Sequence, residues 1–563
     1  MAGAVRGSKA GFLRWRSSVA ALGPRALLAP LLRPGRDVLP VYHRDRPGWV
    51  VAARRLTLVA FIVLFAFVYG VLAAILPPSM LAVAGAPLAV LALLVIWALP
   101  DTKTAPTRAL AIVFTAFFAS IIIWPNYLAI SVAGLPWISM RRLIGIVMSA
   151  LILICLSTSK AYREDMRAIF RASPWVARCL LGWFIVQAIA SLVSGAPSGT
   201  IARLIASTIT STAACFAAIW LFGPGKKSIL WFTNWLLGLV FALMVVGVFE
   251  AHAQHVLWTG HIPSFLQIDP ETLARLIRPN FRGGYRVVTT YTTPLAYGEL
   301  LALTAPFVLF RIVNASTLWR RCLWIGFHLF LLLSILLSGA RLGLVGYIAA
   351  HAIFGLLWGI HRWRNHRGDM LGVSATMLYP AFVVALSVAV VVVPAVHVRV
   401  LGDGKAQGST DARKVQWAMA KPVILRRPLF GYGPGGGGIA INFRAPDGSL
   451  TIDLGLVSVA ADYGLLGLGA YLGVIILSIL ELLRIGLLER RSPFSAEFGL
   501  ATALCVLIST RLVLAQPDND SFFSILFGVA LGSLYLAKRE QGKLNAANGT
   551  AVPAPEERRP ALA

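Results

Sequence analysis

Long apolar runs, separated by short polar stretches, occupy the chain from about residue 56 to residue 536. A helix that crosses a bilayer needs about 20 consecutive, mostly apolar residues. The pattern therefore predicts an all-α polytopic membrane protein with about 12–14 transmembrane helices. The predicted spans are 56–76, 80–99, 109–131, 143–158, 174–194, 201–222, 229–250, 295–313, 319–338, 341–359, 371–394, 452–483, 498–515 and 519–536.

Two long polar intervals, 251–294 and 395–451, interrupt this pattern. The second contains "STDARKVQWAMAKPVILRRPLFGYGPGGGG", with eight basic and three acidic residues in the interval. Its first part predicts a helix at the membrane surface, capped by Ser409, Thr410 or Asp411. The glycines that follow lack the GxxxxGK[ST] pattern of a phosphate loop. They favour a flexible backbone that approaches a ligand closely, with an ordinary loop as the alternative.

Composition agrees with a membrane protein. The chain has 563 residues, of which 58% are hydrophobic and 13% charged, and its mean hydropathy is +0.76. Soluble domains carry about 25% charged residues, so this chain lacks the polar surface of a soluble globule. The five cysteines all fall in predicted spans, without the spacing of metal ligands. We expect no disulfide framework, no metal site and no cofactor.

The net charge of +28 would suit a nucleic-acid-binding protein, but most basic residues lie in the tails and short loops. This arrangement is typical of the positive-inside rule, and we expect no nucleic-acid partner. The rule places both termini in the cytoplasm and the intervals 251–294 and 395–451 outside. Segments 1–55 and 537–563 are predicted to be disordered cytoplasmic tails flanking the membrane domain, 56–536. An organellar transit peptide is the alternative for the first segment.

The first outer interval contains four arginines, Arg275, Arg278, Arg282 and Arg286, shortly before a predicted helix that carries Glu299. Guanidinium groups match phosphate and carboxylate oxygens, so the arginines predict an anion site. A solvated basic loop is the alternative. A carboxylate at membrane depth needs a partner, and we expect one of these arginines to pair with Glu299. That pair would be structural or catalytic.

A second arginine candidate lies in "LLSGARLGLVG". Ser338 and Gly339 predict a tight turn between two spans, which places Arg341 at the outer membrane surface. Snorkelling of its side chain to the interface is the alternative to a ligand-binding role. Arg413 and Arg427, in the interval 395–451, are candidate supporting cations.

Acidic candidates flank the start of the span that follows the second interval, in "TIDLGLVSVAADYGLLG". Asp453 lies at an outer membrane edge among arginines, where a carboxylate would act as a general base or cap the helix. Asp462 lies nine residues further on and is a candidate supporting residue. A further outer cluster, "TRLVLAQPDNDSFF", holds Arg511, Asp518 and Asp520.

Taken in order, Arg286 ahead of "TTYTTPLAYGELLA", the "LSGARLG" turn, "RRPLFGYGPG" and "DLGLVSVAADYGLLG" resemble the O-antigen ligase / O-antigen polymerase superfamily. The resemblance covers roughly residues 124–528. An early stretch, "WPNYLAISVAGLPWISMRRLIG", also resembles the members that polymerise exopolysaccharides. The resemblance implies a metal-independent glycosyltransferase of the C superfamily, embedded in the bacterial inner membrane. Such enzymes take a glycan from undecaprenyl pyrophosphate at the periplasmic face.

The resemblance also implies roles for the candidate residues. By the resemblance, Arg286 and Arg341 would hold the pyrophosphate. From the charge pattern, Arg282 and Arg278 are candidate further ligands, and the interval 395–451 is a candidate lid over such a site. Ligases of the family carry His-Asn where this chain has Asp453-Leu454, and this departure favours a polymerase over a lipid A-core O-antigen ligase. A flippase and a chain-length regulator are candidate protein partners.

A lipid-linked oligosaccharide transporter is the alternative from another class. Transporters often show internal repeats and polar residues near the bilayer midplane. In this chain no repeat stands out, and the predicted outer charges gather at one face. The pattern therefore favours an enzyme that works at one leaflet.

Overall fold

The computed structural model describes residues 81–547 apart from short gaps, together with scattered positions between 53 and 71. The longest gaps are 132–136, 277–283, 395–406, 445–449 and 489–494. Met1–Ala84 and Gly85–Ala563 are separate compact units, and the sections below concern the second. The predicted tail 1–55 and most of the predicted span 56–76 lie outside the described residues.

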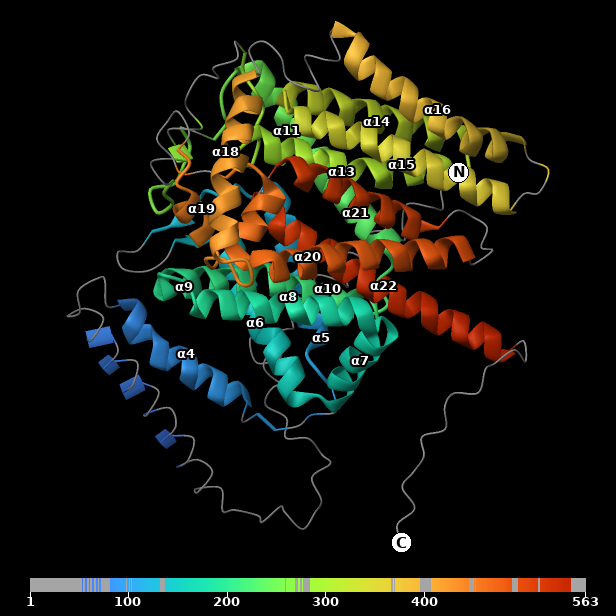
Figure 1. Ribbon diagram of the computed structural model, residues 1–563. Coiled ribbons are helices and arrows are strands. Elements are labelled where there is room, and N and C mark those ends of the chain that lie inside the picture. Colours follow the sequence, from blue (N-terminus) through green and yellow to red (C-terminus); the bar gives the residue numbers. More distant parts are fainter. Residues whose placement is uncertain are drawn as a thin grey trace, which may run out of the picture. The chain divides into compact units, whose positions relative to one another are not determined.

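Helices make up nearly all of the described chain (Figure 1). They are α4 (Leu81–Trp97), α5 (Thr107–Ile123), α6 (Met140–Thr158), α7 (Lys160–Ala172), α8 (Pro174–Leu192), α9 (Pro197–Ser207), η3 (Thr208–Thr212), α10 (Ala213–Phe222), α11 (Ile229–Ala253), α13 (Pro294–Val313), α14 (Leu318–Ser338), α15 (Arg341–Asn365), α16 (Met370–Val392), α18 (Gln407–Arg426), α19 (Gly436–Ile441), α20 (Gly455–Leu488), α21 (Ala496–Val513), η5 (Pro517–Asn519) and α22 (Asp520–Ala547). Two short strands, β1 (Ala129–Ile130) and β2 (Ile138–Ser139), pair antiparallel.

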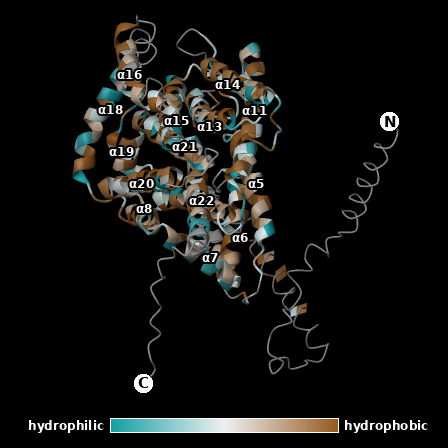
Figure 2. Cartoon of the chain, turned by 90° about the vertical axis from the view of Figure 1, so that its right-hand side faces the viewer, coloured by the Kyte–Doolittle hydropathy of each residue, from teal (hydrophilic) through white to brown (hydrophobic). Residues whose placement is uncertain are grey.

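Nine helices of the described part are long and apolar enough to cross a membrane, and three shorter ones are apolar. Each predicted span from 80–99 onward coincides with a helix or with the continuous run of α9, η3 and α10. Figure 2 shows hydrophobic residues along most of these helices. The prediction of an all-α polytopic membrane protein is therefore confirmed.

Serine and threonine side chains mark where several helices begin. Ser139, Ser228, Thr293 and Thr317 each accept a hydrogen bond from a backbone N–H in the first turn of the helix that follows. Such caps satisfy donors that the helix itself leaves unpaired.

The predicted cap of α18 is wrong. This helix already includes Gln407 and Gly408, so Ser409, Thr410 and Asp411 lie inside it. An N-cap residue stands just outside the helix, with a non-helical backbone, and these three residues do not.

Loops that were predicted to face the same side contact one another. The Asn126 amide donates to the Thr290 carbonyl, and the Arg427 guanidinium donates to the Val193 carbonyl. At the other end, the Lys538 ammonium donates to the Ala172 carbonyl. We refer to the end formed by the described residues of segments 124–139, 254–293, 338–340, 427–454 and 514–519 as the rim.

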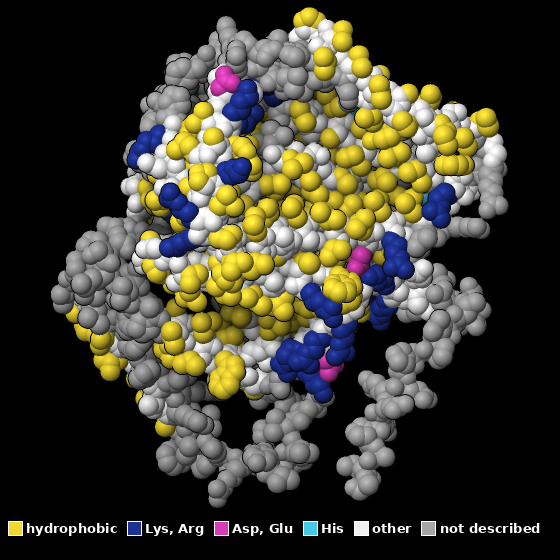
Figure 3. Space-filling view, viewed as in Figure 1, with side chains coloured by type: hydrophobic (Ala, Val, Ile, Leu, Met, Phe, Trp, Pro, Cys, Tyr) yellow, Lys and Arg dark blue, Asp and Glu magenta, His cyan; other side chains and the backbone are white. Residues whose placement is uncertain are grey.

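Helix α18 lies across this end of the molecule. Figure 1 shows it running roughly perpendicular to α15 and α20. Its buried side chains, Ala420, Val423 and Ile424, form one cluster with Ala460 and Ala461 of α20. Its opposite side carries Lys and Arg among exposed apolar side chains (Figure 3). The helix predicted in this interval is therefore confirmed.

Candidate functional site

A buried carboxylate holds the loop that carries Arg286. Glu250, in the last turn of α11, is fully buried and accepts hydrogen bonds from the backbone N–H groups of Val288 at 2.8 Å and Thr289 at 2.9 Å. It also accepts one from the Tyr285 hydroxyl at 2.8 Å. Burial and the neighbouring carboxylate raise the pKa of Tyr285, which therefore remains a donor. These contacts fix the backbone on both sides of Arg286.

Arg286 reaches the turn between α14 and α15. Its Nε donates to the Ser338 carbonyl at 3.0 Å and its Nη2 donates to the Gly339 carbonyl at 3.1 Å. Gly339 has a φ of 56°, a conformation that glycine adopts at little cost. Arg341 follows as the first residue of α15. The structure thus brings Arg286 to the turn that precedes Arg341. We call Arg286, Ser338, Gly339 and Arg341 the arginine turn.

Two helix N-termini meet beside the arginine turn. A Cβ added to Gly298 of α13 would lie 2.7 Å from the Cβ of Ala340, so the first turns of α13 and α15 are in close contact. A helix N-terminus carries a partial positive charge and unpaired N–H groups. Together with the Arg286 guanidinium at the same turn, these termini favour an anion at this part of the rim.

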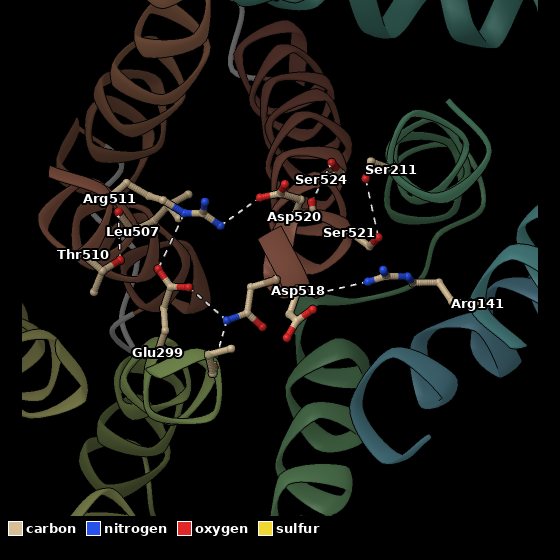
Figure 4. A network of polar contacts seen from close by, with 12 residues as sticks. Arg141, Ser211, Glu299, Leu507, Thr510, Arg511, Asp518, Asp520, Ser521 and Ser524 are labelled. Carbon is tan, nitrogen blue, oxygen red and sulfur yellow. Dashed lines mark hydrogen bonds and ion pairs between the residues drawn. The ribbon is translucent and has the colours of Figure 1, made fainter. Parts of the chain in front are cut away.

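Below this part of the rim lies an ion-pair network (Figure 4). Glu299 is fully buried and pairs with Arg511 of α21 at 3.6 Å, while the Asn519 side chain donates to it at 2.9 Å. Arg511 also pairs with Asp520 at 2.9 Å, and its guanidinium lies 4.0 Å from the ring centroid of Phe523. The network joins α13, α21 and α22.

The partner that we expected for Glu299 therefore needs correction. We expected an arginine of the interval 251–294, but the structure gives the ion pair to Arg511, more than 200 residues away in the chain. Arg286 instead donates to the carbonyls of the turn. The helical packing brings α21 beside α13, which places Arg511 next to the buried carboxylate.

Asp518 extends the contacts toward α6. It accepts hydrogen bonds from the backbone N–H and the hydroxyl of Thr292. Its own carbonyl accepts one from Arg141 at 3.2 Å (Figure 4). Sequence reasoning missed Arg141, although it lies in the "WISMRR" stretch at the start of a span. It also missed Asn519, for which the local pattern carries no signal.

Asp453 lies at the rim, two residues before α20 begins. Its backbone N–H donates to Oε1 of Gln416 at 3.0 Å, which links it to α18. A Cβ added to Gly455 would lie 2.5 Å from the carbonyl oxygen of Arg511. The segment around Asp453 therefore packs against the end of α21, next to the ion-pair network.

Asp462 holds the glycine-rich loop that precedes it in the sequence. Its carboxylate accepts hydrogen bonds from the N–H groups of Gly435 at 2.9 Å and Gly437 at 2.8 Å. A Cβ added to Gly433 would meet the Ser194 Cβ and the Thr200 Cγ2, each at 2.9 Å. The interpretation of a flexible backbone open to a ligand is thus not supported at Gly433, because protein atoms already fill that space.

The remaining candidates are less closely placed. The exposed Arg427 donates to the Val193 carbonyl at 3.3 Å, and its guanidinium lies 5.0 Å from the ring centroid of Tyr432. Arg413 is half-buried on α18. Arg275, Arg278 and Arg282 lie outside the described residues. Within the described part of the chain, no group of three or more His, Cys, Asp or Glu side chains is placed to hold a metal ion.

Comparison with known proteins finds a family match over part of the chain. The family model described as O-Antigen ligase matches residues 326–472, which include Arg341, Asp453 and Asp462. A search of the curated proteins finds no match. The matched region runs from the helix before the arginine turn, through α18, to the first half of α20. Over residues 326–472, the chain is therefore similar to the O-antigen ligase family.

Proposed function

We propose that this protein polymerises glycan repeat units carried on undecaprenyl pyrophosphate, for the assembly of a surface polysaccharide. The rim faces the periplasm of a bacterial inner membrane in this proposal, and both termini lie in the cytoplasm. The family match supports action on lipid-linked glycans. The distribution of basic residues supports the orientation.

The arginine turn is the observation that carries the proposal. Glu250 fixes the backbone beside Arg286, and Arg286 reaches the turn that starts α15 with Arg341. Such prior positioning of cations lets them stabilise charge that develops on a departing pyrophosphate. Arg278 and Arg282 are proposed as further pyrophosphate ligands, and Arg413 and Arg427 as supporting cations.

Asp453 is proposed as the general base. It would accept the proton of an acceptor hydroxyl while the hydroxyl oxygen bonds to the anomeric carbon. The bond from that carbon to the pyrophosphate breaks, and its electron pair leaves with the pyrophosphate. A single direct displacement of this kind inverts the anomeric configuration. The reaction as proposed requires no metal ion.

The residue types at positions 453 and 454 favour polymerisation over ligation. Ligases of the family resembled by this chain carry His-Asn at this place, whereas this chain has Asp453-Leu454. We therefore propose a second lipid-linked repeat unit as the acceptor, in preference to a lipid A core. A flippase that delivers the units and a regulator of chain length are the proposed protein partners.

The proposal is tested by measuring, in cells with arginine variants, on which leaflet the lipid-linked units accumulate. In cells that carry Arg341→Ala or Arg286→Ala, we expect short lipid-linked units to accumulate on the periplasmic leaflet. Lys421→Met, on the exposed side of α18, is the control and should leave polymer formation unchanged. If the units accumulate on the cytoplasmic leaflet instead, the protein acts in flipping, and the enzymatic proposal is wrong.

A further inference from the structure

A buried amide lies beside Asp453. Gln416 is on the side of α18 that faces α20, and its side chain is 1% exposed. Ala420 and Val423, four and seven residues further along the same helix, belong to the apolar cluster between the two helices. A polar side chain in such surroundings is costly unless its polar atoms are paired.

Only one end of this amide is paired. Oε1 accepts the hydrogen bond from the Asp453 N–H at 3.0 Å, whereas Nε2 has no partner and no exposure to solvent. Rotating the amide would not help, because the amino group would then face the Asp453 N–H, donor against donor. The hydrogen bond to Asp453 therefore fixes the orientation of the amide and leaves Nε2 as its unpaired end. A buried unpaired donor costs about 1–3 kcal/mol, and a hydrogen-bond acceptor on a ligand would relieve that cost.

The place of Gln416 suggests which ligand acceptor would suit it. The amide is neutral, and the arginine turn at another part of the rim already supplies the charged donors that suit pyrophosphate. A neutral donor next to the proposed general base is matched to a neutral sugar oxygen. Asp453 would receive a proton from the same sugar under the proposed function.

We propose that Gln416 is a glycan-binding residue, whose Nε2 donates a hydrogen bond to an oxygen of the acceptor sugar. At the same time its Oε1 holds the backbone of Asp453. The inference rests on the proposed function and extends it by assigning the glycan to the α18 side of the rim. It also gives α18 a direct part in substrate recognition.

Two substitutions separate the two ends of the amide. Gln416→Glu keeps an oxygen for the Asp453 N–H and removes the amino donor. Gln416→Met keeps the length of the side chain and removes both functions. Lys421→Met, on the exposed side of α18, serves as the control.

Three measurements are made on the full-length protein in lipid nanodiscs. The first is polymer formation from lipid-linked repeat units extracted from the producing bacterium. The second is binding of the repeat-unit oligosaccharide released from its carrier, and the third is binding of undecaprenyl pyrophosphate. Melting temperature is recorded for each variant.

We expect both Gln416 variants to bind the released oligosaccharide roughly three- to tenfold more weakly, as for the loss of one neutral hydrogen bond. Both should form less polymer and bind undecaprenyl pyrophosphate normally. Both variants should melt at a lower temperature, Gln416→Met because it frees the Asp453 N–H and Gln416→Glu because it buries a carboxylate.

Normal oligosaccharide binding by Gln416→Glu would overturn the inference, since Gln416 would then only anchor Asp453. A parallel loss of pyrophosphate binding would also overturn it, because it would indicate a general structural effect. If the wild-type protein forms no polymer from the extracted units, the proposed function itself fails, and the role of Gln416 fails with it.

Discussion

At the scale of single residues, Glu250 determines where Arg286 lies. Three donors converge on its carboxylate from the loop that carries this arginine. The positive φ of 54° at Thr289 shows that the loop adopts a backbone conformation that is unusual for a residue with a side chain. The hydrogen bonds to Glu250 offset that cost and keep the arginine at the turn.

Glu250→Ala would leave these donors unpaired in a buried place. We expect the variant to lose about 3 kcal/mol or more of stability and most of its polymer formation, because each unpaired group costs about 1–3 kcal/mol. Thermal unfolding in nanodiscs and the polymer assay measure the two effects. Glu164→Gln is the control, since that carboxylate is exposed and pairs with Lys160 at the surface. An unchanged melting temperature for Glu250→Ala would show that the loop is held by other contacts.

The sequence indicated which residue types matter, but not all of their pairings. Arg286 and Arg341 were predicted from basic residues that remain on the outer side of a membrane protein, and the structure brings Arg286 to the turn that precedes Arg341. The partner of Glu299 was predicted wrongly, because the contact with Arg511 depends on how distant helices pack. Gln416 gave no signal, since an amide inside an amphipathic helix looks like any polar position.

At the scale of elements, the contact between α18 and α20 depends on the tight loop between α18 and α19. Gly433 has a φ of 83° and packs against Ser194 and Thr200, while the Asp462 carboxylate holds the next turn. Helix α20 itself bends at Gly464, where φ is 69° and the Leu465 N–H donates to the Pro428 carbonyl. The loop therefore fits into the bend of the helix.

Gly433→Ala should disturb this fit, whereas Gly438→Ala should not. A methyl group at Gly433 would clash and would also strain the backbone, for which we expect a loss of about 2 kcal/mol or more. Gly438 lies in α19, and the nearest atom to an added Cβ is 3.9 Å away, so alanine there should be neutral or slightly stabilising. Melting temperature and hydrogen exchange over residues 429–441 distinguish the two variants. Equal behaviour of both would contradict the tight packing of the loop.

At the scale of the whole molecule, the helical spans could be predicted almost completely. Apolar length is visible in the sequence, and the described helices follow the predicted spans from residue 80 onward. The grouping of loops into two ends was also predictable, because spans alternate in direction. The convergence of α13, α15 and α21 at the rim was not predictable, since it depends on close approaches such as that of Gly298 to Ala340.

The central claim is that the arginine turn binds the pyrophosphate of the lipid carrier. Binding of undecaprenyl pyrophosphate to the full-length protein in nanodiscs tests it without knowledge of the sugar. We expect Arg286→Ala and Arg341→Ala each to weaken binding roughly 10- to 100-fold, as for the loss of a charge-assisted hydrogen bond. Lys421→Met should bind as the wild type does. Unchanged affinity in both arginine variants would contradict the assignment of this site.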